Sequence, residues 1–342
     1  MEDKKELHAV KSGFTVPVAL FNFNRPQMTR HVFEVVRQIK PRKLLLVADG
    51  PRESKPDDVR LCAEVRAVFE EIDWDCEVTR NFSDINLGSF KRNSSGLNWV
   101  FDTVEEAIIL EDDCVPSPSF FPYCEALLEK FRDNTRVGVI SGNNFVPPRS
   151  RQHDASYFFS AYALTWGWAT WRRSWKQVDL TMSWWEPEKG KKLLSTLHPH
   201  PQEREYWYQI YEDIHNGIKK NAWDYQIILS SFLHSQLCVV PGVNLISNVG
   251  HGIDATNCMD ASSPLANMPS ENMEFPLRHP VTVSCNKQMD HAIFKARFHC
   301  YSPQSLQHRI VNIVIRKVGS MLPTTWKANL KKWKRLSMTN KN

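Results

Sequence analysis

Three consecutive carboxylates follow a short, wholly apolar run of the chain. The run spans residues 107–110, and Glu111, Asp112 and Asp113 come directly after it. Such a run is typical of a strand buried on both faces, so the acids should emerge together from a rigid support. Two like charges about 4 Å apart cost on the order of 4 kcal/mol at an effective dielectric near 20, more than a surface interaction returns. A divalent cation would relieve this repulsion, and hard oxygen ligands favour Mn²⁺ or Mg²⁺.

The same acids have a plainer interpretation. Ser117 and Pro118 are typical of the N-cap and the first residue of a helix, and acids near a helix N-terminus need no metal. The triplet precedes that cap by several residues instead of occupying the first turn, which favours the metal site.

Apolar runs of strand length alternate with segments whose apolar residues have helical spacing. Strands are expected at 16–23, 44–48, 76–82 and 107–110, with helices between them. This alternation predicts an α/β fold with a mostly parallel mixed sheet flanked by helices. Residues 225–253 contain no Asp, Glu, Lys or Arg, but polar residues interrupt them too heavily for a membrane span. They are expected to form a buried helix followed by a strand.

Polar side chains end or follow each expected strand. Arg25 follows the first strand, Asp49 follows the second, Arg80 lies near the end of the third, and the acidic triplet follows the fourth. Parallel α/β sheets bind ligands at the carboxyl edge of their strands, so these side chains predict a site there. As alternatives, Arg25 could cap its strand and Asp49 could begin a turn over residues 49–52.

Several of these segments resemble GT-A glycosyltransferases, in particular N-acetylglucosaminyltransferase I and its bacterial relatives. The similar segments lie between residues 16 and 257: Arg80-Asn81, Asn86-Leu87-Gly88, 96–101, 107–113, Pro116-Ser117-Pro118, Phe120-Phe121 and Trp166-Gly167-Trp168-Ala169-Thr170-Trp171. The resemblance implies a GT-A, Rossmann-like catalytic domain over residues 14–260. Residues 261–342 would be a C-terminal helical or irregular extension.

The resemblance also implies an activity and a set of residue roles. A sugar would pass from a nucleotide-diphosphate sugar, with UDP favoured, to a hydroxyl of a glycan or lipid-linked acceptor, in glycan or cell-surface polysaccharide synthesis. Asp113 would bind the Mn²⁺ or Mg²⁺ that holds the donor diphosphate. The positions expected to contact the nucleotide sugar lie near strand ends: Arg25, Asp49 (facing the base), Arg80, Lys91 or its neighbour Arg92, Glu111 and Asp112.

The chemistry of transfer adds a requirement for a base. Negative charge grows on the departing diphosphate, which a metal ion stabilises, and the acceptor hydroxyl must lose a proton to a group within hydrogen-bond reach. Asp224 matches the position where related enzymes place the base of an inverting attack. The alternative is that Asp224 caps the helix that follows it.

A tryptophan-rich segment is expected to form the wall where donor sugar and acceptor meet. Trp166, Trp168 and Trp171 offer flat faces for sugar C–H groups, and Gly167 permits a close backbone approach. The alternative is an aromatic cluster that anchors a loop. Relatives often carry a late metal-ligating His where this chain has Asn257, and His251 could substitute for it, although a lone His is more often structural.

Charge is distributed unevenly along the 342 residues, whose net charge is +5. The last acidic residue is Asp290, and the basic tail over 309–342 mixes apolar residues with Lys and Arg. Such a tail could contact an anionic membrane peripherally or be a solvated terminus. Nucleic acid is disfavoured because no recognition motif accompanies the charge. Eight Cys without a C-x-x-C pair, and no signal peptide, predict a reducing, cytoplasmic location, including the inner face of the cytoplasmic membrane.

Three other functions compete with glycosyl transfer. A nucleotidyltransferase could share a related sheet and metal, but it usually begins with a Gly-rich basic phosphate loop, and residues 18–26 contain no glycine. A non-catalytic carbohydrate-binding protein would use the tryptophans and leave the acidic triplet idle. A membrane-surface adaptor would depend on the basic tail alone.

Overall fold

The structure is a computed structural model that describes residues 13–146, 154–220, 222–251 and 263–298. The chain divides into two compact units, residues 1–296 and 297–342, and the helices and strands that position the site belong to the first. The predicted basic tail lies outside the described residues, as does Asn257.

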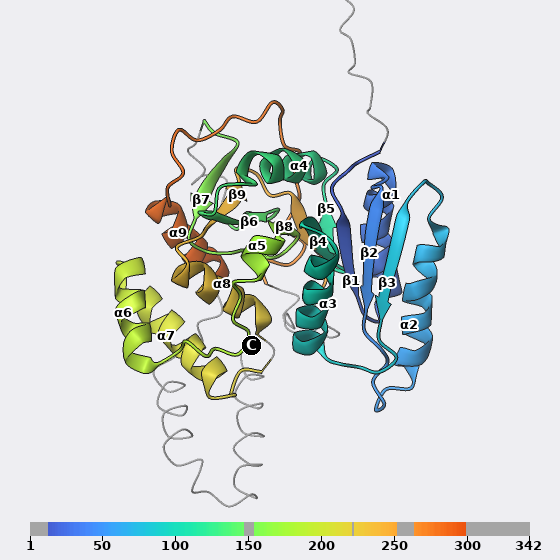
Figure 1. Ribbon diagram of the computed structural model, residues 1–342, viewed down its shortest axis with the longest axis horizontal. Coiled ribbons are helices and arrows are strands. Elements are labelled where there is room, and N and C mark those ends of the chain that lie inside the picture. The colour runs from blue at the N-terminus through green and yellow to red at the C-terminus, as the bar shows by residue number, and fades with distance from the viewer. Residues whose placement is uncertain (1–12, 147–153, 221, 252–262, 299–342) are drawn as a thin grey trace, which may run out of the picture. The chain divides into compact units, whose positions relative to one another are not determined.

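An eight-stranded sheet forms the centre of the first unit, in the order β3-β2-β1-β4-β8-β6-β9-β7 (Figure 1). Its strands are β1 (Val18–Asn22), β2 (Lys43–Ala48), β3 (Glu77–Phe82), β4 (Glu106–Glu111), β6 (Val137–Ser141), β7 (Tyr157–Ser160), β8 (Trp168–Trp171) and β9 (Leu237–Pro241). Strands β3, β2, β1 and β4 are mutually parallel, β6 is parallel to β9, and β8 and β7 run antiparallel to their neighbours. This is the mostly parallel mixed sheet of a Rossmann-like GT-A fold, as the sequence predicts.

Helices cover both faces of this sheet. The helices of the described residues are α1 (Pro26–Ile39), α2 (Asp57–Val68), η1 (Phe69–Glu71), α3 (Ser89–Thr103), α4 (Phe120–Phe131), α5 (Arg172–Trp175), α6 (Pro187–Leu197), α7 (Pro201–His215), α8 (Trp223–Leu233), α9 (Lys287–Ile293) and the π-helix η3 (Phe294–Phe298). Alternate strand residues such as Leu20 and Leu46 join one core with the apolar faces of α1, α2 and α4. On the opposite face α3 packs so closely that a Cβ on Gly96 would lie 2.6 Å from the ring of Phe21.

The expected elements agree with the observed ones in most places. Each predicted strand is present. The apolar residues of β1, β2 and β4 are buried on both faces of the sheet, whereas the edge strand β3 is only partly buried. The uncharged stretch forms helix α8 and then strand β9, and no helix among the described residues is long and apolar enough to cross a membrane. The predicted helix start differs: α4 begins at Phe120 after the N-cap Ser119, whereas Ser117 and Pro118 precede the helix.

A second, two-stranded sheet brings a distant segment to the end of β4. Strand β5 (Cys114–Pro116) pairs antiparallel with β10 (Ile246–Asn248), so that Cys114 faces Asn248. Gly167 permits this packing, because its φ is +59° and a Cβ there would lie 2.4 Å from Cδ1 of Ile246. The chain after β10 therefore lies against the acidic triplet.

Candidate functional site

The carboxyl ends of β1 and β4 place a guanidinium group beside the acidic triplet. Phe21 pairs with Glu111 in the parallel register, and the chain after β1 turns into α1 at Arg25. Arg25 Nη1 lies 3.0 Å from Asp113 Oδ2 and 3.8 Å from Asp112 Oδ1. The structure thus brings together two of the predicted strand ends, and Arg25 is the cation that pairs with the triplet among the described residues.

Burial and neighbouring charges raise the pKa of two members of the triplet, Glu111 and Asp112. The pKa of Glu111 is raised well above its usual value, first by burial and then by the charges of Asp113, Asp112 and Asp224. Burial raises the pKa of Asp112 to about 6, in spite of the opposing charge of Arg25. Burial would lower the pKa of Arg25, but the charges of Asp112 and Asp113 outweigh it and raise that pKa. The site therefore holds an excess of negative charge that one guanidinium does not neutralise.

The segment after β10 encloses Asp113 from the other side. Asn248 Nδ2 donates to Asp113 Oδ1 at 3.3 Å, and the Val249 amide donates to the Asp113 carbonyl at 2.9 Å. A Cβ on Gly250 would lie only 2.0 Å from Asp113 Oδ2, so no larger residue fits there without displacing the carboxylate. The sequence analysis did not predict roles for Asn248 and Gly250. A pattern that could have indicated them is a glycine two residues after an Asn that ends a strand.

Asp224 lies close enough to the triplet for its charge to raise the pKa of Glu111. Helix α8 begins at Trp223 with Ala222 as its N-cap, so Asp224 is the second residue of the helix. The alternative prediction, in which Asp224 is the N-cap of this helix, is therefore wrong. Asp224 is thus a fourth carboxylate whose charge acts on the site.

These residues fit a hard divalent cation. Asp112 is 6% exposed, and its Oδ2 is buried without a hydrogen-bond partner among the described residues. An unpaired buried carboxylate oxygen costs free energy that a bound cation would recover. The donor atoms are carboxylate oxygens, which Mn²⁺ and Mg²⁺ prefer.

Asp49 is buried at the end of β2 and holds a loop. Its carboxylate accepts hydrogen bonds from the Gly50, Leu87 and Gly88 amides at 2.9–3.0 Å, and from Asn86 Nδ2 at 3.1 Å. A nucleotide base would therefore have to share or displace these donors. The structure joins Asp49 to the Asn86-Leu87-Gly88 segment that contributes to the resemblance.

The basic residues predicted near β3 have different surroundings. Arg80 lies on the edge strand and forms an exposed ion pair with Glu70, 3.3 Å away. Arg92 is buried, and its Nη2 donates to Oδ1 of Asn81 at 2.7 Å. Lys91 is exposed in the first turn of α3. Of the two neighbours left open by the sequence, Arg92 is thus engaged in the fold and Lys91 faces solvent.

The tryptophan segment is divided between two edges of the sheet. Trp168 pairs with Ile109 near the carboxyl end of β4, whereas Trp171 pairs with Glu106 at the opposite end. The side chains of both are buried, at 1% and 3% exposure, which leaves no face for a sugar. Trp171 is therefore separated from the predicted wall by the length of β4. The prediction was wrong for Trp171 because the sequence does not reveal the direction of β8.

Trp166 and His251 lie together at the carboxyl edge. The Trp166 ring is partly buried and meets the His251 ring at a centroid distance of 5.6 Å and the Phe145 ring at 5.0 Å. Gly167 connects Trp166 to β8. Of the predicted wall, Trp166 and Gly167 are thus the members placed beside the end of β4.

A cleft of about 1120 Å³ opens on the other side of Arg25, between the starts of α1 and α2. Its lining includes Asn24, Arg52 and Asp58. Asp58 accepts from Asn24 at 2.8 Å and from Arg52 at 2.6 Å. Arg25 therefore stands between this cleft and the acidic triplet.

Comparisons with known proteins find weak similarity to solved structures and no match to a family or a curated protein. Among solved structures, mouse xyloside xylosyltransferase 1 in its apo form is similar at 13% identity and a TM-score of 0.35, over 66% of this chain and 85% of that chain. The 4-diphosphocytidyl-2C-methyl-D-erythritol synthase of Anaerococcus prevotii is similar at 10% identity and a TM-score of 0.31, over 63% of this chain and 83% of that chain.

A third similar structure is the inositol-1-phosphate CTP transferase of T. maritima, at 13% identity and a TM-score of 0.29, over 51% of this chain and 77% of that chain. Similarity at this level assigns no activity. The fold rests on the strand order of the central sheet, and membership of the N-acetylglucosaminyltransferase I branch stays a prediction.

Proposed function

We propose that this protein is a metal-dependent glycosyltransferase that moves a sugar from a nucleotide-diphosphate sugar to a hydroxyl acceptor. The observation that carries the proposal is the crowded set of carboxylates at the end of β4. Arg25 forms ion pairs with Asp112 and Asp113 and interacts with the charge of Glu111, and Asp112 retains a buried oxygen without a partner among the described residues. A site built for a cation and an anionic substrate accounts for this arrangement.

Asp113 is the residue we assign to the metal, with Glu111 and Asp112 contributing charge and contacts to the nucleotide sugar. Mn²⁺ or Mg²⁺ bound there would supply Lewis-acid stabilisation of the departing diphosphate. Arg25 is 3.0 Å from Asp113 and can pair with a phosphate oxygen as well as with the carboxylate. Asp49, Arg80 and Lys91 keep their predicted roles toward the nucleotide as proposals.

Asp224 is the proposed general base. Its charge acts on Glu111, which supports a position near the metal-binding carboxylates. A carboxylate there could accept the proton of an acceptor hydroxyl that attacks the sugar from the face opposite the diphosphate, which would invert the anomeric configuration. Trp166, Gly167 and His251 lie at the same edge and are the proposed contacts to sugar or acceptor.

Substrates and location are assigned from the resemblance. We favour a UDP-sugar donor and a glycan or lipid-linked acceptor in polysaccharide synthesis. The basic tail would hold the protein peripherally at the inner face of the cytoplasmic membrane.

A panel of nucleotide sugars tested with Mn²⁺ for transfer, hydrolysis and thermal stabilisation checks the proposal. Asp113→Ala should abolish metal-dependent transfer. Asp224→Asn should retain donor binding and lose about 10²–10⁴-fold in turnover. Asp133→Asn, which removes an exposed acid after α4, is the control and should behave like the wild type.

Three results would contradict the proposal. Turnover that is unchanged in Asp113→Ala removes the metal role. Release of pyrophosphate from a nucleoside triphosphate and a sugar phosphate would identify a nucleotidyltransferase instead. Sugar binding that is indifferent to EDTA and without turnover would identify a carbohydrate-binding protein.

A further inference from the structure

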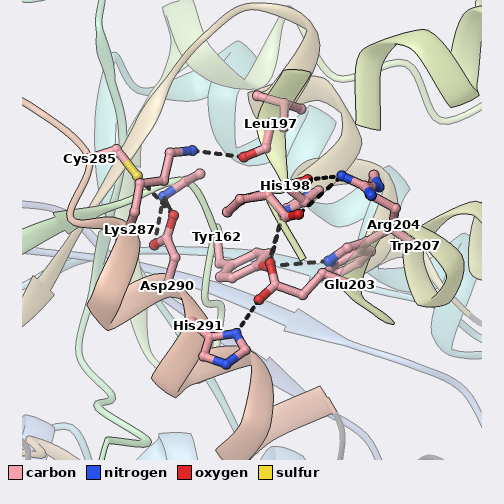
Figure 2. Close-up of polar contacts among 12 residues, drawn as sticks. Tyr162, Leu197, His198, Glu203, Arg204, Trp207, Cys285, Lys287, Asp290 and His291 are labelled. Carbon is pink, nitrogen blue, oxygen red and sulfur yellow. Dashed lines mark hydrogen bonds and ion pairs between the residues drawn. The ribbon is translucent and has the colours of Figure 1, made fainter. Parts of the chain in front are cut away.

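A second group of possible metal ligands lies between helices α7 and α9, outside the carboxylate site. Its members are His200, Glu203 and His291. Figure 2 shows Glu203 and His291 directed at each other. His200 is the N-cap of α7, Glu203 follows in its first turn, and His291 is in the last turn of α9. One ligand atom from each residue lies within 4.8 Å of the others. Residues about 90 positions apart in the sequence therefore converge on one point.

The buried member of the group is a carboxylate between two imidazoles. Glu203 is 2% exposed, and its Oε1 lies 2.5 Å from Nδ1 of His291. Its Oε2 lies 3.2 Å from Nδ1 of His198 and accepts from the Tyr162 hydroxyl at 3.2 Å. Both oxygens of this buried carboxylate are therefore held by neighbouring side chains.

Contacts behind Glu203 orient it in the manner of an outer coordination shell. Trp207 Nε1 donates to the Tyr162 hydroxyl at 3.4 Å, and His198 stacks on the Tyr162 ring at a centroid distance of 5.7 Å (Figure 2). Residues that fix the orientation of a ligating carboxylate typically matter nearly as much as the ligands themselves. Here they hold Oε2, so that Oε1 is directed at His291.

The two histidines of the group lie against each other. The rings of His200 and His291 stack with centroids 3.9 Å apart and an interplanar angle of 28°. An imidazole nitrogen is a common metal ligand. His200 is exposed, so an ion can reach the group from solvent.

We propose that His200, Glu203 and His291 bind one divalent transition-metal ion of the zinc class. Two imidazole nitrogens and one carboxylate oxygen, with water in a remaining position, suit Zn²⁺ or Co²⁺ better than Mn²⁺ or Mg²⁺. The ion would replace the proton between Glu203 and His291 and add a charge opposite to that of the buried carboxylate. The site differs from the oxygen-only carboxylate site at the end of β4, and it does not depend on the proposed glycosyl transfer.

Such an ion would fasten α9 to the start of α7. Two contacts already hold α9 in place: Lys287 donates to the Leu197 carbonyl at 2.8 Å (Figure 2), and Asp290 accepts from Ser160 at 2.7 Å. Both lie on the same helix as His291. A metal between α7 and α9 would therefore act as a further cross-link in a region that is joined by polar contacts.

Titration of the metal-free full-length protein with Co²⁺ tests the proposal, because four-coordinate Co²⁺ with nitrogen ligands absorbs visible light far more strongly than octahedral Co²⁺ with oxygen ligands. The wild type should develop strong bands with one equivalent, and Zn²⁺ should remove them. His200→Ala should weaken Co²⁺ binding at least tenfold and abolish the bands. His200 is exposed, so its removal opens no cavity in the core. His31→Ala, at an exposed position of α1, is the matched control and should retain the bands.

Asp113→Ala should also retain the strong bands, because it alters only the carboxylate site. Weak, octahedral-type spectra in the wild type, or bands that persist unchanged in His200→Ala, would overturn the proposal. Loss of the bands in Asp113→Ala would overturn it as well, since the ion would then lie at the end of β4. A failure of glycosyl transfer would leave these readouts unaffected.

Discussion

Replacing Arg25 by alanine should destabilise the protein, and Mn²⁺ should reverse much of the loss. Arg25 lies 3.0 Å from Asp113 and 3.8 Å from Asp112, and its side chain is 19% exposed. At an effective dielectric near 20 these two attractions amount to about 5.5 and 4.4 kcal/mol before desolvation is subtracted. Breaking a buried ion pair by removing one partner typically costs 3–5 kcal/mol, and we expect about 3 kcal/mol here because the pair is partly exposed. For a unit of roughly 300 residues this corresponds to a fall in melting temperature of about 5 °C.

A divalent cation should substitute for the lost guanidinium. Saturation at 100 times the dissociation constant stabilises a protein by about 2.7 kcal/mol. Mn²⁺ should also bind the variant at least tenfold more tightly than the wild type, since a tenfold change is about 1.4 kcal/mol and the competing positive charge has gone. The assay is thermal unfolding with EDTA or with graded Mn²⁺, together with calorimetric titration.

Arg52→Ala provides a matched control for this experiment. Arg52 Nε lies 2.6 Å from Asp58, whose side chain is 3% exposed, so that variant also loses a partner of a buried carboxylate. Asp58 does not belong to the acidic triplet, and Mn²⁺ should shift the melting temperature of Arg52→Ala no more than that of the wild type. Equal Mn²⁺ shifts in Arg25→Ala, Arg52→Ala and the wild type would refute the idea that Arg25 and a cation share one site.

Two further predictions concern a glycine and a loop. Gly250→Ala should lose the Mn²⁺-dependent stabilisation, because a Cβ there would lie 2.0 Å from Asp113 Oδ2. Calorimetric titration with Mn²⁺ checks this. The control is Gly217→Ala, which should cost about 1–2 kcal/mol of stability because the φ of Gly217 is +67°, but should retain Mn²⁺ binding. Burial would raise the pKa of Asp179, but hydrogen bonds from Thr181 and neighbouring residues lower it to about 2. Because this pKa is lower in the folded state, Asp179→Asn should lower the free energy of unfolding by about 1–2 kcal/mol above pH 4. The difference from the wild type should vanish as the pH falls through 2. Urea unfolding from pH 6 to pH 2 measures this difference, and a constant difference would contradict the prediction.

Much of the first half of the fold could be predicted because its strands are short, apolar and separated by helices. Burial on both faces imposes an uninterrupted apolar run, which the residues of β1, β2 and β4 all show. The rule that parallel strands present their ends at one edge then predicts that Arg25 and Asp113 are neighbours, and they are 3.0 Å apart. Local sequence and one topological rule were sufficient for this part of the site.

Other parts of the site depend on pairings that no local pattern encodes. The direction of β8 decides that Trp168 lies near the carboxyl edge and that Trp171 lies at the other edge, yet both tryptophans look alike in the sequence. The β5–β10 pairing brings Asn248 to Asp113 across 135 positions. Contacts at such separations are set by the packing of the whole unit, so the sequence alone could identify these residue types but not their partners.

The two proposed cation sites differ in how far apart their residues lie in the sequence. The carboxylate site is local: its three acids are consecutive, their repulsion is visible in the sequence, and only their partners needed the structure. The group of His200, Glu203 and His291 is not local, because its members come from two helices that the fold brings together. Oxygen donors alone suit an ion that is exchanged along with a phosphate-bearing ligand, whereas two imidazoles and a buried carboxylate suit an ion that stays with the protein. We therefore expect chelation to act in two stages, with Mn²⁺ leaving the end of β4 at chelator concentrations that still leave a zinc-class ion between α7 and α9.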